Sequence, residues 1–436
     1  MEITLRCKRT HAHESLDKHG KKCKTCSSPL ERLCSRCNNF VSYSNFKVHK
    51  CGEAADQPVL PRVPPPGKRK LKFSVLGGGW VLGKNDEYLV TPMGEYKEHL
   101  PVGFPKEQFR FIQESTVNDP DTILDAYDAV WGLVAMDEDY DLVCVYKFLP
   151  DLLRAMKERT IPSELDFLVV GNWVHPTVYS AGTLSAVQEL FSALLDLEVE
   201  HGLRVFPPPE YCWFFARKAQ YYHRLQLALP LSVSARVIPT IVVSKDHNWK
   251  GAVREFAKEQ RAKEIVFKRE LSDMKRHQQI MKVKSLGALD DRGQFHWLAQ
   301  PFVPEFGQYF EMRMFVLQGK CAFGVTTKFS GQDGSISLAG TAPGRRNWDE
   351  PLGGRAAAMV AERVVDCIRH DQAGAGQFLR VDLVRRDNSA ESEWWLNELE
   401  FFGNAALMLE AFDNGDDMLQ DIATCAKVWV RDLIRN

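Results

Sequence analysis

FLRVDLV (378–384) and EWWLNELEFFGN (393–404) are the two stretches of sequence that decide the predicted fold. Both are apolar runs that carry isolated charges, and a short charged turn separates them, which predicts two adjacent buried strands. Glu398 and Glu400 lie two positions apart and therefore share one face of a strand, and the pairing brings Asp382 beside them. Such carboxylates are costly unless positive charge offsets them, and Mg²⁺ prefers their oxygens. We therefore expect a magnesium site.

Three cations lie in other apolar segments and are suited to the same site. Lys268 lies in EIVFKR (264–269), Arg313 lies in EMRMFV (311–316), and Arg380 shares a strand face with the metal-site aspartate. Each cation taken alone is explained as well by a buried salt bridge. Together, beside three carboxylates, they predict a polyphosphate that is clamped with a metal ion.

The order of these motifs resembles the ATP-grasp superfamily over roughly residues 205–430. The motifs are a strand lysine, E-x-R-x-F, R-V-D and N-E-x-E-x-x-G-N. The EMRMFV segment is also similar to cell-division-cycle-type proteins that assist assembly of a translation initiation factor, and to viral ATP-grasp proteins. The resemblance implies an ATP-grasp fold in which two subdomains hold ATP with Mg²⁺ or Mn²⁺.

The resemblance also implies which residues contact the nucleotide. Lys268 matches the strand lysine that contacts the α-phosphate, and Lys218 in FARKAQ matches a second nucleotide-binding lysine. The segment WLAQPFVPEF (297–306) resembles the linker strand, where backbone from Gln300 to Phe302 would hold adenine. Glu305 would then take the ribose hydroxyls.

The metal and catalytic positions are implied in the same way. Asp382, Glu398 and Glu400 match the metal-binding residues, and Glu400 stands where Asn is commoner in the family. Arg380 of the R-V-D motif would neutralise the transferring phosphate, and Arg313 would act beside it on the nucleotide.

One departure from the family concerns the phosphate lid. Many members follow the strand lysine with a glycine-rich loop, whereas this chain has RELSDMKRHQQIMKVKS (269–285), which lacks glycine. Four cations of this segment are candidate phosphate donors in its place: Lys275, Arg276, Lys282 and Lys284.

The first 51 residues hold six of the 11 cysteines, together with several histidines. Two Cys-x2-Cys pairs provide the knuckles that zinc sites use, and a segment this short has too little core to fold alone. The candidate ligands are Cys23, Cys26, Cys34, Cys37, His49 and Cys51. A zinc-binding module is therefore expected.

The assignment of these ligands stays open between alternatives. One possible zinc site has the four ligands Cys34, Cys37, His49 and Cys51. Cys23 and Cys26 would then take partners from Cys7, His11, His13 and His19. A site formed by Cys23, Cys26, Cys34 and Cys37 satisfies the ligand requirements of zinc equally well. A basic tail without metal is the remaining interpretation.

Composition and length set the class of protein. A chain of 436 residues predicts two or three domains, and a net charge of -1 excludes a globally basic nucleic-acid binder. No apolar run of about 18 residues occurs, so no membrane span is expected. Clustered cysteines and the absence of an apolar signal sequence predict a reducing compartment, the cytoplasm or the nucleus.

The predicted architecture is α/β (α+β). A zinc module (1–52) and a Pro-rich basic linker (53–72) precede an N-terminal α/β domain (73–204), then a central (205–299) and a C-terminal (300–436) ATP-grasp subdomain. Apolar runs at 166–171 and 237–243 predict strands. Helical spacing predicts helices over 183–201, 355–369 (with Met359 on the apolar face) and 416–434.

The leading functional hypothesis is an ATP-dependent ligase that joins a carboxylate to an amine or thiol through an acyl phosphate. This chemistry is implied by the family resemblance. The acceptor is expected to be a protein or peptide that the zinc module recruits. The alternatives are an ATP-binding assembly factor with little or no turnover, and a nucleic-acid tether formed by the basic N-terminus.

Overall fold

The structure is a computed structural model of the chain. The described residues are 5–7, 30–33, 40–42, 69–77, 100–105, 107–109, 126–146, 149–170, 184–229, 234–244, 248–271, 278–289, 296–330, 335–342, 354–386, 393–405, 407, 409 and 415–435. The chain divides into two compact units, Met1–Pro65 and Pro66–Asn436. The division falls inside the predicted linker, and strand β4 begins at Leu71, one residue before the linker was expected to end.

The first unit contains a three-stranded antiparallel sheet. Its strands are β1 (Leu5–Cys7), β2 (Leu30–Leu33) and β3 (Phe40–Ser42), in the order β1-β2-β3. The six principal zinc candidates of the sequence are not among these strand residues. Cys23, Cys26, Cys34, Cys37, His49 and Cys51 lie outside the described residues. The zinc module therefore stays a prediction.

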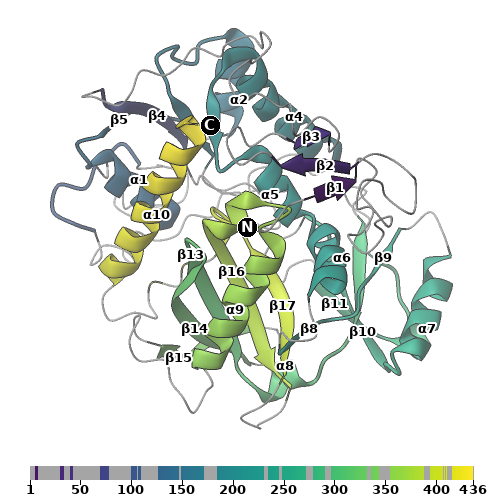
Figure 1. The fold of residues 1–436 in the computed structure, drawn as a ribbon. Helices are drawn as coiled ribbons and strands as arrows, with labels where there is room; N and C mark the ends of the chain where they lie inside the picture. Colours follow the sequence, from purple (N-terminus) through teal and green to yellow (C-terminus); the bar gives the residue numbers. More distant parts are fainter. Residues whose placement is uncertain are drawn as a thin grey trace, which may run out of the picture. The chain divides into compact units, whose positions relative to one another are not determined.

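The second unit begins with a parallel sheet in the order β5-β4-β6-β7. The strands are β4 (Leu71–Leu76), β5 (Tyr140–Tyr146), β6 (Phe167–Val170) and β7 (Arg204–Phe206). The helices that contact it are α1 (Ala126–Ala135), α2 (Leu149–Glu158), α4 (Leu184–His201) and α10 (Gly415–Arg435). In Figure 1, α10 from the end of the chain lies beside α1. Helices on a parallel sheet bury its strands, as the apolar run at 167–170 requires.

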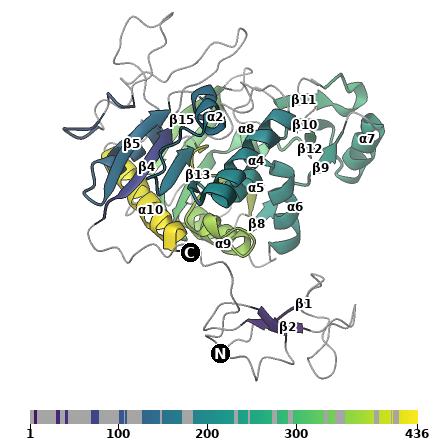
Figure 2. The same ribbon diagram turned by 90° about the horizontal axis from the view of Figure 1, so that it is seen from above.

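A six-stranded sheet, in the order β15-β14-β13-β16-β17-β8, forms the second layer. Its strands are β8 (Ala235–Val237), β13 (Glu311–Leu317), β14 (Lys320–Ser330), β15 (Ser335–Ala342), β16 (Phe378–Arg385) and β17 (Trp394–Glu400). Helix α9 (Gly354–Ile368) packs on β13, β14 and β16. Figure 1 shows α9 lying over these strands, and Figure 2 shows α9 and β13 turned by 90°. The shorter elements around it are α5 (Pro209–Ala216), α6 (Lys218–Ala228), α8 (Glu305–Gln308) and the 3-10 turn η9 (Ala373–Gly376).

A smaller antiparallel sheet, in the order β11-β10-β12-β9, has a core of its own. Its strands are β9 (Ile241–Val243), β10 (Glu264–Arg269), β11 (Gln278–Lys282) and β12 (Trp297–Pro301). Helix α7 (Trp249–Glu259) and the turn η6 (Val283–Ser285) cover one face, where Phe256, Phe267 and Trp297 are buried. The other face carries Lys268. Strand β12 crosses the predicted subdomain boundary at 299/300.

Two expectations from the sequence were wrong. The run 237–243 is not one strand: it is divided between β8 and β9, which belong to different sheets. Pro239 lies at the break, and proline cannot donate a backbone hydrogen bond to a sheet. Met359 lies on α9 but is 53% exposed, so it does not belong to the apolar face of that helix.

One aromatic cluster joins the parallel sheet to the six-stranded sheet. The ring of Phe402, directly after β17, lies 5.1 Å from Phe206, 5.2 Å from Phe378 and 5.0 Å from Tyr127, between ring centroids. Trp429 of α10 contacts the same group. Because these rings come from both sheets, the two layers share one core.

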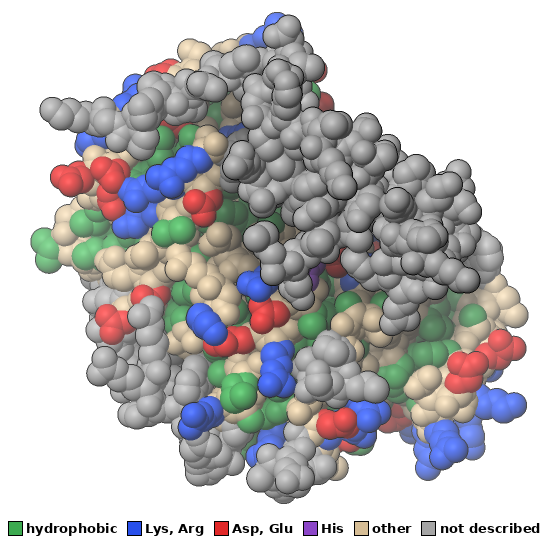
Figure 3. All heavy atoms as spheres, viewed as in Figure 1, with side chains coloured by type: hydrophobic (Ala, Val, Ile, Leu, Met, Phe, Trp, Pro, Cys, Tyr) green, Lys and Arg blue, Asp and Glu red, His purple; other side chains and the backbone are tan. Residues whose placement is uncertain are grey.

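The surface of the described residues carries mixed charge. Figure 3 shows Lys and Arg side chains interspersed with Asp and Glu over the visible face. This arrangement agrees with the net charge of -1. None of the helices in the described part of the chain has an apolar stretch long enough to cross a lipid bilayer.

Tyr211 offers a test of this core, because its buried hydroxyl holds two strand ends together. The hydroxyl donates to the Phe378 carbonyl at 2.7 Å and accepts from the Phe402 backbone N–H at 3.1 Å. Tyr211→Phe is expected to lower the free energy of unfolding by about 1–3 kcal/mol, because both backbone groups lose a buried partner. Urea denaturation measures the change, with half-buried Tyr309→Phe as the control. Equal losses in the two variants would contradict this role.

Candidate nucleotide and metal site

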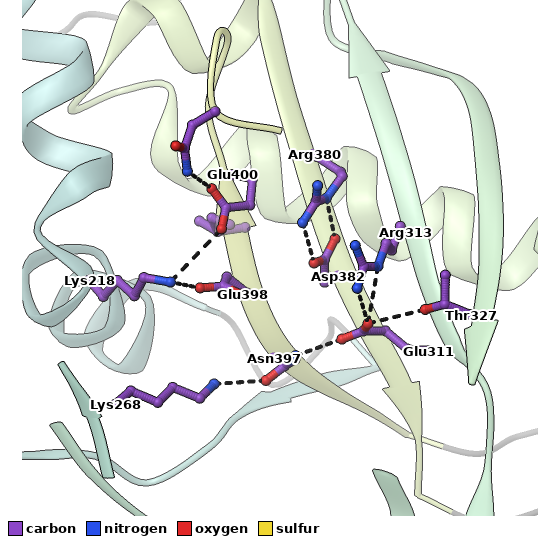
Figure 4. A network of polar contacts seen from close by, with 12 residues as sticks. Lys218, Lys268, Glu311, Arg313, Thr327, Arg380, Asp382, Asn397, Glu398 and Glu400 are labelled. Atoms are coloured by element: carbon purple, nitrogen blue, oxygen red, sulfur yellow. Dashed lines mark hydrogen bonds and ion pairs between the residues drawn. The ribbon is translucent and has the colours of Figure 1, made fainter. Parts of the chain in front are cut away.

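A network of charged side chains lies between the six-stranded sheet and the smaller sheet (Figure 4). The ammonium of Lys268 on β10 donates to the Asn397 Oδ1 on β17 at 3.0 Å. The Asn397 Nδ2 in turn donates to the Glu311 Oε1 on β13 at 2.6 Å. These two bonds connect strands of both sheets, so the inner face of each sheet belongs to one site.

A β-bulge in β17 determines which side chains enter this site. Asp382 pairs with Glu398, whereas the next residue, Leu383, pairs with Leu396, so Asn397 is an extra residue in the ladder. In a regular strand Glu398 would share the buried core face with Leu396. The bulge shifts the alternation, and Asn397, Glu398 and Glu400 all belong to the site.

Glu311 is the acceptor at which three donors meet. Besides the Asn397 amide, the Arg313 Nε donates to the Glu311 Oε2 at 3.1 Å and the Thr327 hydroxyl donates to it at 3.2 Å. Burial alone raises the pKa of the Glu311 carboxyl, but Arg313, Asn397 and Arg380 outweigh it and the pKa is lowered. Glu311 is therefore ionised at neutral pH although it is only 2% exposed.

Arg380 and Asp382 form a buried bidentate pair along β16. The Arg380 Nε and Nη2 donate to the two oxygens of Asp382, each at 2.8 Å. Burial by itself lowers the pKa of the Arg380 guanidinium, yet Asp382 and Glu400 more than offset this and the pKa is raised. Arg313 lies opposite Asp382 in the neighbouring strand. The aspartate is thus surrounded by cations before any ligand binds.

The other two carboxylates of the site share a lysine. The ammonium of Lys218, the first residue of α6, forms an ion pair with Glu398 and lies 3.9 Å from the Glu400 Oε1. The Glu400 Oε2 accepts from the Asn404 amide. Asn404 follows Gly403, whose φ of 86° allows the chain to turn back toward the strand. Burial raises the pKa of Glu400 despite these partners.

The carboxylates of this site suit a divalent metal ion whose remaining coordination positions are filled by a bound ligand. Across the described stretches, no group of three or more His, Cys, Asp or Glu side chains is arranged to hold a metal ion. Glu398 and Glu400 nevertheless share one cation, the Lys218 ammonium. Mg²⁺ is usually held by one or two carboxylates together with phosphate oxygens and water. A cation already stands between these two carboxylates, so the pair fits the metal that the sequence predicts.

Lys268 has an unusual environment for a lysine. Burial lowers the pKa of its ammonium, and the nearby Lys218 lowers it further, to about 7, although Glu311, Asp382 and Glu400 oppose the shift. A desolvated amine among mixed charges is stabilised as a cation by any anion that enters the site. Lys268 is therefore suited to contact phosphate.

The inner face of the smaller sheet combines this lysine with apolar side chains. Ile280 on β11 pairs with Val266, two residues before Lys268 and on the same face. Val242 on β9 pairs with Leu298, which pairs with Lys268. Ile280 and Val242 are 55% and 53% exposed on this face. Exposed apolar side chains beside a half-buried cation are typical of a surface that takes a ligand.

The residues expected to hold the base and ribose lie along β12 and just beyond it. Gln300 is buried, shares the Lys268 face through its pairing with Val266, and donates to the Thr240 hydroxyl at 2.9 Å. Phe302 is 38% exposed, and its backbone N–H donates to the Glu264 carbonyl at 3.0 Å. Glu305 begins α8. Their nucleotide contacts stay predictions.

Seven of the residues predicted for the phosphates and metal are brought together by the structure. These are Lys218, Lys268, Arg313, Arg380, Asp382, Glu398 and Glu400. Sequence reasoning missed Glu311 and Asn397, although both lie inside the motifs that were quoted. Of the lid cations, Lys282 and Lys284 are exposed, and Lys275 and Arg276 lie outside the described residues.

Comparison with known proteins gives a likeness of folds at low similarity. No family model matches the sequence, and no curated protein sequence matches it. The solved structures that match include D-cycloserine synthetase DcsG (19% identity, TM-score 0.45, covering 69% of this chain and 92% of that one). D-alanyl-alanine synthetase A from Vibrio cholerae matches with 11% identity and a TM-score of 0.48, covering 84% and 100%.

The ATP-grasp ligase PsnB, complexed with a minimal precursor, matches with 14% identity and a TM-score of 0.38, covering 61% of this chain and 78% of that one. Two of these three solved structures are named as synthetases, and one is named as an ATP-grasp ligase. At these values the likeness says nothing about the activity of this chain. The similarity to cell-division-cycle-type and viral proteins stays a prediction.

The Arg380–Asp382 pair gives a direct test of the buried charges. Arg380→Met is expected to lower the free energy of unfolding by about 3–5 kcal/mol, because Asp382, which is 1% exposed, loses its bidentate partner. The double variant Arg380→Met/Asp382→Leu is expected to lose less, since no charge is left unpaired. Guanidinium denaturation measures both.

The control for this comparison is a surface pair of the same type. Arg224 forms an ion pair with Asp371 and is 44% exposed, so Arg224→Met is expected to cost about 1 kcal/mol or less. If Arg380→Met unfolded at the same denaturant concentration as Arg224→Met, the charge balance described above would be wrong.

Proposed function

We propose that this chain binds ATP with Mg²⁺ between its six-stranded sheet and its smaller four-stranded sheet β11-β10-β12-β9, and acts as an ATP-dependent ligase of the ATP-grasp superfamily. The observation that supports this most is the meeting of Lys268 with Asn397, which joins a cation on the small sheet to the carboxylate-bearing strands of the large one. Opposed sheets with buried charge between them suit a polyphosphate.

The nucleotide is proposed to lie along the inner face of the smaller sheet. Lys268 and Lys218 contact the phosphates, and the exposed apolar side chains of Val242 and Ile280 lie against the base. Backbone groups from Gln300 to Phe302 hydrogen-bond the adenine, and Glu305 accepts from the ribose hydroxyls. A concave site of this kind combines apolar surface with a few polar groups that fix orientation.

Asp382, Glu398 and Glu400 are proposed to hold the metal. When bound, Mg²⁺ neutralises phosphate oxygens and lowers the barrier to transfer of the terminal phosphate. Metal binding requires these carboxylates to exchange their present partners, Arg380 and Lys218, for the ion. Mn²⁺ has the same preference for oxygen ligands and is expected to substitute.

In the proposed reaction a substrate carboxylate oxygen attacks the γ-phosphorus, and the bond between that phosphorus and the bridging oxygen of ADP breaks. The resulting acyl phosphate is attacked at its carbonyl carbon by an amine or thiol, and inorganic phosphate leaves. Arg313 and Arg380 stabilise charge on the transferring group. Positioning and charge stabilisation are the main contributions of such a site.

The N-terminal unit is proposed to recruit the partner of this reaction. Its cysteines and histidine bind Zn²⁺ in this proposal, and the resulting module presents a protein or peptide acceptor. As an alternative to recruiting a protein or peptide, the basic N-terminal residues bind nucleic acid.

A non-ligating ATP-binding assembly factor is the second candidate for the function. The observation that favours it is the Arg380–Asp382 pair, which already occupies both oxygens of a proposed metal ligand. In such a protein the bound nucleotide would stabilise one arrangement of the two sheets without turnover.

The experiment that separates the two candidates measures ATP binding and ADP formation with the full chain. Binding of a Mg-bound, non-hydrolysable ATP analogue is expected, together with ADP release when pools of carboxylates and amines are supplied. Asp382→Asn and Glu398→Gln are expected to abolish magnesium-dependent nucleotide binding, while Glu362→Gln, a surface carboxylate on α9, leaves it unchanged. ATP binding without ADP formation in every pool would favour the assembly factor, and unchanged affinity in both site variants would refute the site.

The pKa of Lys268 makes nucleotide affinity dependent on pH. Since the pKa is about 7 without ligand and a bound phosphate favours the ammonium, binding above pH 7 must take up a proton. Affinity for the analogue is therefore expected to fall as pH rises above about 7, by at most about tenfold per pH unit. Calorimetry from pH 6 to 9 measures this dependence.

Lys268→Arg is the control for the pH profile, because guanidinium stays charged over this range and the nucleotide's own titration is common to both proteins. The variant is expected to lose the decline in affinity above pH 7. Parallel pH profiles for the two proteins would show that Lys268 does not carry the dependence.

A further inference from the structure

Lys218 carries its charge at a position where the backbone disfavours a cation. It is the first residue of the 11-residue helix α6, and the N-terminus of a helix bears partial positive charge from backbone N–H groups. The chain reaches this position through Arg217, which ends α5 and precedes α6. A lysine held here requires compensation from anions outside the helix.

The compensating anions are the two carboxylates that follow the bulge of β17. The Lys218 ammonium pairs with Glu398 and lies 3.9 Å from Glu400, and its side chain is only 10% exposed. Both carboxylates belong to the proposed metal site. The ammonium therefore lies near two of the carboxylates that would hold a metal ion, and it supplies them with one positive charge in place of that ion.

We propose that Lys218 is the resident counter-cation of the metal site and makes metal binding depend on nucleotide. Without nucleotide its ammonium holds Glu398 and Glu400. When a triphosphate enters, the ammonium moves to the phosphate oxygens and leaves the two carboxylates to the metal. This inference rests on the proposed nucleotide site and assigns Lys218 a positioning role in it.

The balance of charge supports this order of events. The network contains four basic side chains and four carboxylates, and Lys268 reaches Glu311 only through the Asn397 amide. The basic side chains are Lys218, Lys268, Arg313 and Arg380, and the carboxylates are Glu311, Asp382, Glu398 and Glu400. A divalent ion that entered alone would leave positive charge without a partner in a buried site, which is costly. An anionic triphosphate removes that cost by receiving the lysines. Metal and nucleotide therefore favour each other's binding.

The test measures Mn²⁺ binding in the absence of nucleotide. Electron paramagnetic resonance of the free ion gives the amount of Mn²⁺ that is not bound. Wild-type protein is expected to bind Mn²⁺ weakly and to gain affinity when a non-hydrolysable ATP analogue is added. Lys218→Met is expected to bind Mn²⁺ at least tenfold more tightly than wild type without nucleotide. Its melting temperature is expected to rise with Mn²⁺ more than that of wild type, because metal now neutralises the two carboxylates.

Two further variants make the result specific. Lys320→Met removes a lysine that is 80% exposed and paired with Glu362, and it is expected to behave as wild type. Lys218→Met/Glu398→Gln is expected to lose the gain in Mn²⁺ affinity. If Lys218→Met does not fold, Lys218→Gln, which keeps a polar side chain without the charge, is measured in the same way.

The outcomes distinguish this inference from the proposed function. If wild type binds the analogue but neither Lys218 variant gains Mn²⁺ affinity, the counter-cation role is overturned and the nucleotide site stands. If wild type does not bind the analogue, the proposed function fails. A gain in the Lys218 variants that the Glu398→Gln change removes would then still support Lys218 as the cation that occupies a metal site.

Discussion

Charge neutrality between the six-stranded sheet and the smaller sheet is the constraint on which the site depends. The carboxylates on β13, β16 and β17 are tolerated in this site because each has a cation close to it. Arg313 lies beside Glu311, Arg380 lies beside Asp382, and Lys218 lies beside both Glu398 and Glu400. Removing one partner from such a set leaves a charge with no solvent to stabilise it. The stability of each of these charges therefore depends on the partners around it.

The bulge at Asn397 is the local feature that places these charges. Before it, Trp394 and Leu396 face the core, and after it Leu399 takes the core face, so the alternation changes phase by one residue. Without this shift Glu398 and Glu400 would be directed into an apolar core, at a cost that no nearby cation offsets. One inserted residue thus directs both carboxylates into the charged network and away from the apolar core.

The sequence predicted the strands that carry the site and the residues on them, because isolated charges in apolar runs are a strong signal. The prediction from the sequence failed where the assignment of a strand or a site residue depended on residues that are close in space but distant in the chain. The run 237–243 was read as one strand because its apolar pattern does not reveal that β8 and β9 join different sheets. Asn397 was missed since strict alternation places it away from Glu398, although the change of phase between Leu396 and Leu399 is visible in the sequence. Glu311 was passed over because its role comes entirely from partners on β14 and β17.

Asn397 also determines how the two sheets are coupled. Its amide accepts from Lys268 on the smaller sheet and donates to Glu311 on the larger one, so the two sheets are linked through this single side chain. An anion that attracts Lys268 weakens the bond to the Asn397 oxygen, and the direct link between the sheets is then replaced by a link through the ligand. A neutral amide is suited to this place, because it satisfies a cation and a carboxylate at once and adds no charge to a balanced set. An aspartate here would hold Lys268 more tightly and would repel Glu311, and it would therefore oppose the exchange of partners in the proposed nucleotide binding.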